Sequence, residues 1–581
     1  MTDHPFDRAT LDALLFNWLE IGTLADLPAH EGQTPEDWRA VLDLADRISR
    51  EAFAPAWRAS DQVEPQLVDG TVVVEPGTRK AVRAWLDAGL HLAGVPEDEG
   101  GMSLPFTVVA GTMAMSMAAH IAASSFPMLS VANTRVIRTF GTPAQVAAFA
   151  QPQQEGEALG TMCLSEPAVG SSLGDTTTRA LPDGKDDLGP RYRLRGTKMW
   201  ISSGGQDITP MTVHLVLAKV EQPDGSLIPG SGGLSLFAVP SVLPDGAEND
   251  VTVAGLNHKM GWRGTPNCVM AFGENEGARG WRIGAEGQGL PIMFQMMNEA
   301  RIGVGIGAAA LAWRGYLASR AYASERVQGR PLEDRNHPAP VPLLRHPDVR
   351  RMLLAQKAIA EGSLAMCLYA ARLVDQEASG DAEAGRLLGL LTPIVKSWPS
   401  EMGLVANHYA IQIHGGYGYT RDFEVEQIYR DNRLNPIHEG TTGIQGIDLL
   451  GRKVIFDKTG GIELLMQRIR ETEARAEDML PDCAAALRKA RAAVEQAVDT
   501  VRGQNDPAAA LANATQFLSA TGHLVAGWLL TDLATRPGPL NDGHKVAARY
   551  FAGFELPHVQ AWLAPVMAQS DLTATLEEDW V

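Results

Sequence analysis

One acidic residue, Glu439, stands in a segment whose composition suits proton transfer. It lies in the run Ile437-His-Glu-Gly-Thr-Thr442, between a glycine-rich stretch and a helical pattern. Gly440 lets the backbone turn directly after the acid without a side chain that would crowd a ligand. A carboxylate at such a turn is a candidate general base, and Thr441 suits a cofactor contact or a helix cap. The alternative is a solvated Glu-Gly turn, the commoner role for this pair.

A second polar segment, residues 161–174, begins like a strand and continues into a Pro/Gly turn. Backbone amides and the hydroxyls of Ser165 and Ser171 would be exposed at that turn, where they can donate to a polar heterocycle or a phosphate. The alternative is a plain loop.

A third segment, residues 196–205, contains Trp200 and Ser202, two positions apart on a predicted strand. Side chains alternate across a strand, so both are expected on one face, where an aromatic plane and a hydroxyl suit a flat ring system. The alternative is a buried tryptophan that anchors the β-core.

Length and composition limit the classes of protein to which this chain can belong. The chain has 581 residues, 45% of them hydrophobic and 6% aromatic, and a net charge of −19, which disfavours nucleic-acid binding. Four cysteines lie far apart and form no Cys-x-x-Cys pair, so they are expected to be reduced thiols. Neither a signal peptide nor an uninterrupted apolar run of about 18 residues is evident, so no membrane span and a cytoplasmic location are expected.

Periodicity divides the chain into four parts of an α+β protein. Residues 1–157 have helical spacing, and the apolar run from Phe106 to Leu129 is expected to form a buried helix pair. Residues 158–286 alternate strand-like runs with turns, which predicts a middle β-domain. Residues 287–454 return to long helical segments with short connections, typical of a bundle. Residues 455–581 add further amphipathic and apolar helices.

These motifs, in this order, resemble those of the acyl-CoA dehydrogenases, flavoproteins that desaturate acyl-CoA thioesters. The run from Gln412 to Gln445 is similar to the C-terminal signature of the family, with His438 where a tyrosine is usual. Residues 161–174 and 196–205 resemble its Thr-Glu-Pro-x-Ala-Gly-Ser and Lys-x-Trp-Ile-Thr/Ser motifs. The resemblance covers residues 80–453. The added C-terminal helices resemble the long branch that includes 3-(methylthio)propanoyl-CoA dehydrogenases.

The resemblance implies a fold and a set of site residues. The fold would comprise an N-terminal helical domain, a middle β-domain and a C-terminal four-helix bundle, here followed by an additional helical domain. Glu439 would be the catalytic base. Contacts to FAD would come from Leu164, Ser165, Ser171, Trp200, Ser202, Arg326, Gln412, Gly415, Gly416 and Thr441. Contacts to the substrate would come from Ser171, Arg301 and Gly440, and no metal is expected.

A second acid, Glu299, is the rival base. Some family members place their base on the helix that carries Arg301, immediately before the arginine, where this chain has Ala300. Glu299 lies one residue earlier, which is about 100° around the helix. Glu439 is therefore favoured.

The resemblance also implies partners: an acyl-CoA substrate, an electron-transfer flavoprotein as acceptor, and a second copy of the chain, most simply in a homodimer. Three alternatives are an oxygen-using acyl-CoA oxidase, which could share every motif, a non-enzymatic DNA-binding relative, and a scaffold that has lost flavin, which is disfavoured because the base and most cofactor positions are present. The DNA-binding relative carries a basic C-terminal domain, whereas residues 455–581 here contain 11 Lys/Arg against 17 Asp/Glu.

Overall fold

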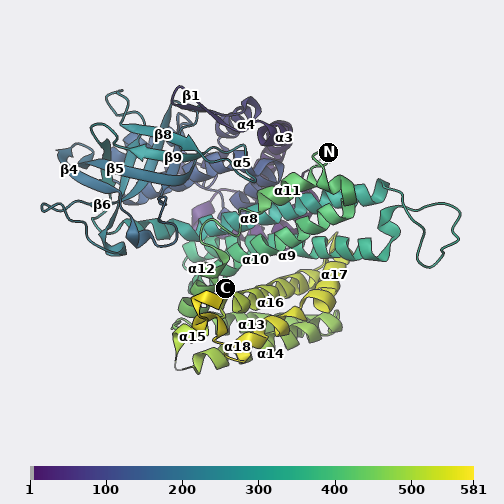
Figure 1. Cartoon of the computed structure of the whole chain (residues 1–581). Helices are drawn as coiled ribbons and strands as arrows, with labels where there is room; N and C mark the ends of the chain where they lie inside the picture. Colours follow the sequence, from purple (N-terminus) through teal and green to yellow (C-terminus); the bar gives the residue numbers. More distant parts are fainter. Residues whose placement is uncertain (1–4, 505, 581) are drawn as a thin grey trace. The chain divides into compact units, whose positions relative to one another are not determined.

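A computed structural model describes residues 5–504 and 506–580, which fall into two compact units. Unit 1 contains the chain up to Asp46, Leu104–Ala118 and Arg301 onward; unit 2 contains Arg47–Ser103 and Ala119–Ala300. The architecture is α+β, with helical, β and helical parts in that order and further helices at the C-terminal end, as predicted (Figure 1). The four-domain division at residues 157, 286 and 454 stays a prediction.

Unit 2 is built on a strongly curved sheet. Strand β10 pairs with both β7 and β5, and the pairs β7–β6, β6–β4 and β4–β5 complete a closed ring of strands. The ring is extended by β3 beside β6, by β9 beside β5 and by β8 beside β9. The strands are β3 (Ala158–Cys163), β4 (Arg179–Asp186), β5 (Gly189–Ser202), β6 (Met211–Val220), β7 (Leu234–Pro240), β8 (Val251–Leu256), β9 (Asn267–Phe272) and β10 (Ala278–Ile283).

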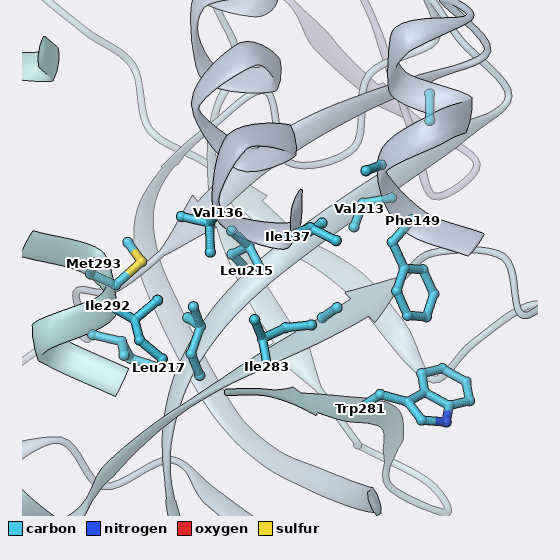
Figure 2. Close-up of a cluster of buried hydrophobic side chains, with 14 of the residues drawn as sticks. Val136, Ile137, Phe149, Val213, Leu215, Leu217, Trp281, Ile283, Ile292 and Met293 are labelled. Atoms are coloured by element: carbon cyan, nitrogen blue, oxygen red, sulfur yellow. The ribbon is translucent and has the colours of Figure 1, made fainter. Parts of the chain in front are cut away.

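Both faces of this sheet are buried. Along β6, Val213, Leu215 and Leu217 join one hydrophobic cluster, whereas Val216 and Ala218 join another. Figure 2 shows the first cluster, in which Val136, Ile137 and Phe149 from the helical segments lie over the strands. Because successive side chains of a strand point to opposite faces, an uninterrupted apolar run such as β6 is expected where both faces are covered.

Shorter elements complete unit 2. They are α3 (Ala54–Gln62), β1 (Gln66–Val68), β2 (Thr71–Val73), α4 (Pro76–Asp87), α6 (Pro143–Gln145) and α7 (Gln151–Gln154). The β1–β2 hairpin was not predicted, although Asp69-Gly70 between two valine-bearing runs is a recognisable hairpin signal. Both turn residues have positive φ, 49° and 83°, as a tight two-residue hairpin turn requires.

Helix α5 (Phe106–Phe140) is broken into two helical parts at His120, whose φ of −161° and ψ of 87° are not helical. The predicted helix pair is therefore confirmed, with its break inside the apolar run. One window of α5 is long and apolar enough to span a bilayer, with a mean hydropathy of 1.5, but 83% of that window is buried inside the protein. Such burial is typical of a core helix.

Unit 1 is helical. Its helices are α1 (Arg8–Asp12), α2 (Pro35–Ile48, ending in unit 2), the unit 1 parts of α5 and α8 (Gly289–Glu325), α9 (Pro347–Ala378), α10 (Ala382–His414), α11 (Val425–Asn432), α12 (Thr442–Ile447), α13 (Gly461–Ala476), α14 (Pro481–Arg502), α15 (Pro507–Leu511), α16 (Ala514–Thr535), α17 (Asn541–Tyr550), α18 (His558–Met567) and α19 (Leu572–Thr575). The C-terminal segments 507–535 and 541–567 are each divided, into α15 and α16 and into α17 and α18.

The C-terminal helices are attached to α9 and α10 through buried polar groups. The fully buried carboxylate of Glu361 on α9 is bonded to His544 of α17 and to Lys357, whose Nζ lies 2.5 Å away. The indole of Trp398 on α10 donates to Nδ1 of His523 on α16 at 2.8 Å. In Figure 1, α13 and α16 lie beside α10, and α14 and α18 pack against these two helices in turn.

Candidate active site

The loop that carries Glu439 follows α11 and has two consecutive residues in the left-handed region. Glu439 has φ 53° and Gly440 has φ 88°. The carbonyl of Glu439 accepts a bond from Nε2 of Gln445 at 3.0 Å. A Cβ at position 440 would lie 2.6 Å from that same nitrogen. Glycine is therefore required here both for its conformation and for the close approach of Gln445.

Two groups of Glu439, its carboxylate and its backbone N–H, take no part in holding the described residues together. Within residues 5–504 and 506–580, neither its carboxylate nor its backbone N–H has a hydrogen-bond partner, and the residue is solvent-exposed. Dense surrounding protein raises the pKa of the Glu439 carboxyl, although Lys396 and Arg301 act in the opposite direction. A raised pKa with retained solvent access is what a general base near neutral pH needs.

A buried lysine lies against this loop. Lys396 on α10 has no solvent exposure, and its Nζ donates to the carbonyl of Gly440 at 2.7 Å. Burial lowers the pKa of Lys396 to about 8, against the raising effects of Glu439 and Glu401. Sequence reasoning missed this residue. The available signal was a single charge inside the apolar run Pro393-Ile-Val-Lys-Ser-Trp398.

Three buried asparagines form a ladder of hydrogen bonds that ends at the same loop. Asn407 of α10 donates to the carbonyl of Leu311 at 3.0 Å, Asn432 of α11 donates to Asn407 at 2.7 Å, and Asn435 donates to Asn432 at 2.9 Å. Asn435 Oδ1 then lies 3.2 Å from His438 Nε2. Burial lowers the pKa of His438 to about 3, with a further contribution from Lys396, so the imidazole is neutral at physiological pH. The ladder was also missed by sequence reasoning.

The predicted substrate residue Arg301 is engaged in a buried ion pair. Its Nη1 lies 3.0 Å from Asp448, which also pairs with Arg452 at 2.9 Å. Its role toward a substrate stays a prediction. The rival base Glu299 lies in unit 2, where Arg135 binds its carboxylate. Glu439 is thus the acid of the two without an ion-pair partner among the described residues.

The glycine-rich turn lies beside the predicted phosphate-binding arginine. The guanidinium of Arg326 lies 6.0 Å from the ring of Tyr417. Gln412, Gly415 and Gly416 are exposed, and a Cβ at either glycine would meet nothing within 4 Å. Arg326 and Thr441 are exposed as well, and the Thr441 hydroxyl caps α12 by accepting from Ile444. Unit 1 therefore brings an arginine and the glycine-rich backbone together.

In unit 2 a buried ion pair joins the other two predicted segments. Nζ of Lys198 lies 3.0 Å from Glu166 and 2.9 Å from the carbonyl of Leu164. Burial opposes ionisation of Glu166, but Lys198 and the hydrogen bonds from Thr178 and Thr177 hold its pKa at about 2. Glu166 and Lys198 were not among the predicted site residues.

That ion pair places Ser165 close to Trp200. The backbone N–H of Met199 donates to the carbonyl of Ser165 at 3.0 Å. Trp200 has φ 67° and is 57% exposed, and the pairing of β5 with β9 shifts register between Lys198 and Ile201. The regular alternation used to predict that Trp200 and Ser202 share a face is therefore interrupted at this bulge. Ser202 is half-buried, and Ser171 lies exposed on the turn.

These features fit a flavin dinucleotide. An exposed tryptophan held in a strained conformation offers a face to a planar ring, as strained residues at binding sites commonly do. In unit 1, the open backbone at Gly415 and Gly416 beside Arg326 suits a diphosphate. The groups available to contact such a cofactor are hydroxyls, amides, an aromatic ring and a guanidinium.

One cluster has the spacing of metal ligands: His523, Glu555 and His558, whose ligand atoms lie within 4.8 Å of one another. The Trp398 indole donates to Nδ1 of His523, so a neutral imidazole carries its proton on Nε2. That Nε2–H points toward Glu555, 3.8 Å away. The nitrogen that faces the cluster is thus protonated, which opposes metal binding.

Comparison with known proteins identifies the class. Residues 161–274 match "Acyl-CoA dehydrogenase, middle domain", residues 287–454 match "Acyl-CoA dehydrogenase, C-terminal domain", and residues 465–577 match "Acetyl-CoA dehydrogenase C-terminal like". The 3-methylmercaptopropionyl-CoA dehydrogenase of Ruegeria pomeroyi is 37% identical over 514 residues, which are 85% of this chain and 84% of the relative.

Two solved structures share the fold at 20% identity. Caenorhabditis elegans ACDH-11 in complex with C11-CoA has a TM-score of 0.77 and covers 96% of this chain and 93% of its own. An acyl-CoA dehydrogenase from Bacillus anthracis, complexed with FAD, has a TM-score of 0.73 and covers 96% and 91%.

The chain belongs to the acyl-CoA dehydrogenase family of FAD-dependent oxidoreductases that act on CH–CH bonds. Within the family it is of the long form, which carries the additional C-terminal helical domain.

Proposed function

We propose that this enzyme removes the α and β hydrogens of an acyl-CoA thioester, with Glu439 as the base that takes the α-proton. The observation that carries the proposal is a carboxylate with solvent access and a raised pKa, for which the described residues offer no ion-pair partner. A base that formed a salt bridge in the resting enzyme would have to break it before each turnover.

The reaction balances with one proton and one hydride. Glu439 accepts the proton from the α-carbon as that C–H bond breaks, and the electron pair left behind forms the α,β double bond. The FAD held by the residues named below would supply the acceptor for the β-hydrogen and its electron pair. Glu439 afterwards releases its proton to solvent, to which the residue has access.

The α-proton of a thioester is only weakly acidic, so negative charge on the thioester oxygen needs stabilisation. The backbone N–H of Glu439 suits this role, because no described residue accepts a bond from it. The bonds at the Glu439 and Gly440 carbonyls hold the two peptides that directly follow this N–H. The role of Gly440 at the substrate is part of this proposal, as are those of Arg301 and Ser171.

We propose the following residues as the FAD contacts. Leu164, Ser165, Ser171, Trp200 and Ser202 would contact the flavin ring and its surroundings, and Thr441 would add a hydroxyl. Arg326, Gln412, Gly415 and Gly416 would bind the diphosphate region. In the family the glycine-rich turn reaches the flavin of a neighbouring subunit, so we propose a homodimer.

The acyl group, the electron acceptor and the location are also proposals. The Ruegeria relative is named for a short thioether acyl-CoA, so a short or thioether-bearing acyl chain is the first candidate substrate. We propose an electron-transfer flavoprotein as acceptor and the cytoplasm as location. The four domains would be residues 1–157, 158–286, 287–454 and 455–581.

The decisive experiment follows the flavin spectrum after anaerobic addition of acyl-CoAs of increasing length, including 3-(methylthio)propanoyl-CoA. We expect bleaching by particular members with the wild type. Glu439→Gln should retain flavin but lose bleaching by several orders of magnitude, because the amide accepts no proton. Glu299→Gln is the matched control and should bleach normally.

Bleaching by Glu439→Gln at the wild-type rate would overturn the assignment. Rapid re-oxidation by oxygen with peroxide release, and no transfer to an electron-transfer flavoprotein, would instead identify an oxidase.

A further inference from the structure

Lys396 is an unusual residue for its position. It lies on α10 midway between Pro393 and Pro399, both inside the helix, and its side chain has no solvent exposure. Removing an ammonium from water is costly unless the protein supplies strong partners. Its Nζ donates a hydrogen bond to a neutral acceptor, the carbonyl of Gly440 at 2.7 Å, rather than to a carboxylate. A buried ammonium bonded in this way contributes little to stability, which points to a functional role.

We propose that Lys396 is a positioning residue for proton abstraction: its ammonium fixes the Gly440 carbonyl and places a positive charge beside Glu439. The inference rests on the proposed role of Glu439 as the base.

The geometry of the loop supports positioning. The carbonyl of Glu439 is held by Gln445 from α12, and the next carbonyl, that of Gly440, is held by Lys396 from α10. Two successive carbonyls are thus fixed from two different helices. The peptide that follows the base cannot rotate without breaking one of these bonds, so the left-handed conformation of Glu439 is maintained while its carboxylate stays free.

The charges around Lys396 are arranged so that its own charge matters most to Glu439. Arg301 is paired with Asp448 at 3.0 Å, and the Glu401 carboxylate accepts from the Thr442 hydroxyl at 2.5 Å. His438 is neutral, because burial and Lys396 lower its pKa to about 3. Lys396 and Arg301 are the cations that lower the pKa of Glu439, and burial lowers the pKa of Lys396 itself to about 8.

The charge of Lys396 sets the direction in which its removal should shift the pKa of Glu439. A positive neighbour favours the carboxylate form of Glu439, so the loss of Lys396 should raise the pKa of the base further. The enzyme would then need a higher pH to have its base ionised. The loss of the bond to Gly440 should separately lower the rate at the pH plateau, since the carboxylate would be held less firmly toward the substrate.

The test measures the rate of anaerobic flavin bleaching by a saturating acyl-CoA between pH 6 and 10, using holoenzyme. For Lys396→Met we expect the acid limb of the profile to move up by about one pH unit and the plateau to fall on the order of tenfold. KM should change far less than kcat. The control Lys458→Met, which removes an exposed lysine charge, should leave the profile unchanged.

If Lys396→Met is unstable, Lys396→Arg is the second variant, because it keeps a positive charge at position 396. The wild-type profile should show an inflection near pH 8, where Lys396 loses its proton and the positive charge beside Glu439. Because a guanidinium does not titrate below pH 12, this inflection should be absent in Lys396→Arg while the acid limb stays in place. An acid limb that is unmoved in a folded Lys396→Met with full flavin content would overturn the inference, as would a wild-type inflection that persists in Lys396→Arg.

Glu439→Gln is measured in parallel. If it retains bleaching, the proposed base is wrong. If it loses bleaching and the Lys396 variants keep the wild-type pH profile, Glu439 stands and only the role of Lys396 fails.

Discussion

The side-chain nitrogen of Asn432 lies so close to Gly403 that a Cβ at position 403 would be 2.7 Å away from it. Gly403 is on α10, and Asn432 is the middle member of the asparagine ladder beneath the Glu439 loop. The backbone oxygen of Ala308 would be 3.1 Å from the same Cβ. The ladder can therefore form only because residue 403 has no side chain that would displace the Asn432 amide.

We expect Gly403→Ala to destabilise the protein by about 1–3 kcal/mol, because the added methyl group must displace a buried, hydrogen-bonded amide. Thermal unfolding measures this. Gly389→Ala on the same helix is the matched control, since its Cβ would meet only Lys453 Nζ at 3.8 Å. Alanine there should be neutral or stabilising by up to about 1 kcal/mol. Equal effects of the two substitutions would contradict the ladder.

The Glu166–Lys198 pair predicts acid sensitivity of unit 2. The folded pKa of Glu166 is about 2, against 4.5 for the ordinary carboxyl, and the residue is 4% exposed. Its contribution to stability is thus complete above pH 4.5 and is lost as the pH falls toward 2. Roughly 3 kcal/mol is expected to disappear over that window.

Urea unfolding at a series of pH values measures this loss. Glu166→Gln should be less stable at neutral pH and should depend less steeply on pH between 4.5 and 2. A variant with the same pH slope as the wild type would assign the acid sensitivity to other carboxylates.

Trp200 predicts a conflict between stability and flavin binding. A bulky residue at φ 67° is strained by about 1 kcal/mol, and the ring is mostly in solvent, so little packing is lost when it is removed. Trp200→Gly should therefore raise the unfolding temperature of flavin-free protein while lowering its flavin content after reconstitution. Trp200→Ala should lose flavin without the gain in stability. Unchanged flavin affinity in both would remove Trp200 from the site.

The His523 cluster predicts a negative result with zinc. Because the Trp398 indole fixes the proton of His523 on the nitrogen that faces Glu555, zinc should not raise the unfolding temperature of metal-free protein. Trp398→Phe removes the indole donor and frees the tautomer, at a cost in packing. A saturable rise with the wild type that is lost in His523→Gln would establish a metal site.

The sequence was informative where a local rule governs the structure. The apolar runs of β6 and β7 predict buried strands, and Gly440 after Glu439 predicts a tight turn. The Asp69-Gly70 hairpin was equally readable and was missed. By contrast, Lys396 and Gly440 are 44 residues apart, and Asn407 and Asn432 are 25 apart. Such contacts depend on how helices pack, which periodicity does not specify.

The bulge at Trp200 shows the same limit. Alternation places residues on faces only while the strand pairs regularly, and the register shift between Lys198 and Ile201 breaks that condition. What the sequence indicated was the presence of an aromatic residue and a hydroxyl in one short segment; their directions depend on pairing with β9.

The C-terminal helices have a consequence for how this long form can have arisen. His544 and His523 provide the partners of Glu361 and Trp398, which lie on the bundle helices α9 and α10 and are buried. Cutting the chain near residue 455 would expose an indole and leave a carboxylate with Lys357 alone. Deleting the extra helices is therefore expected to destabilise the bundle as well, because the surface that receives them is built around their side chains.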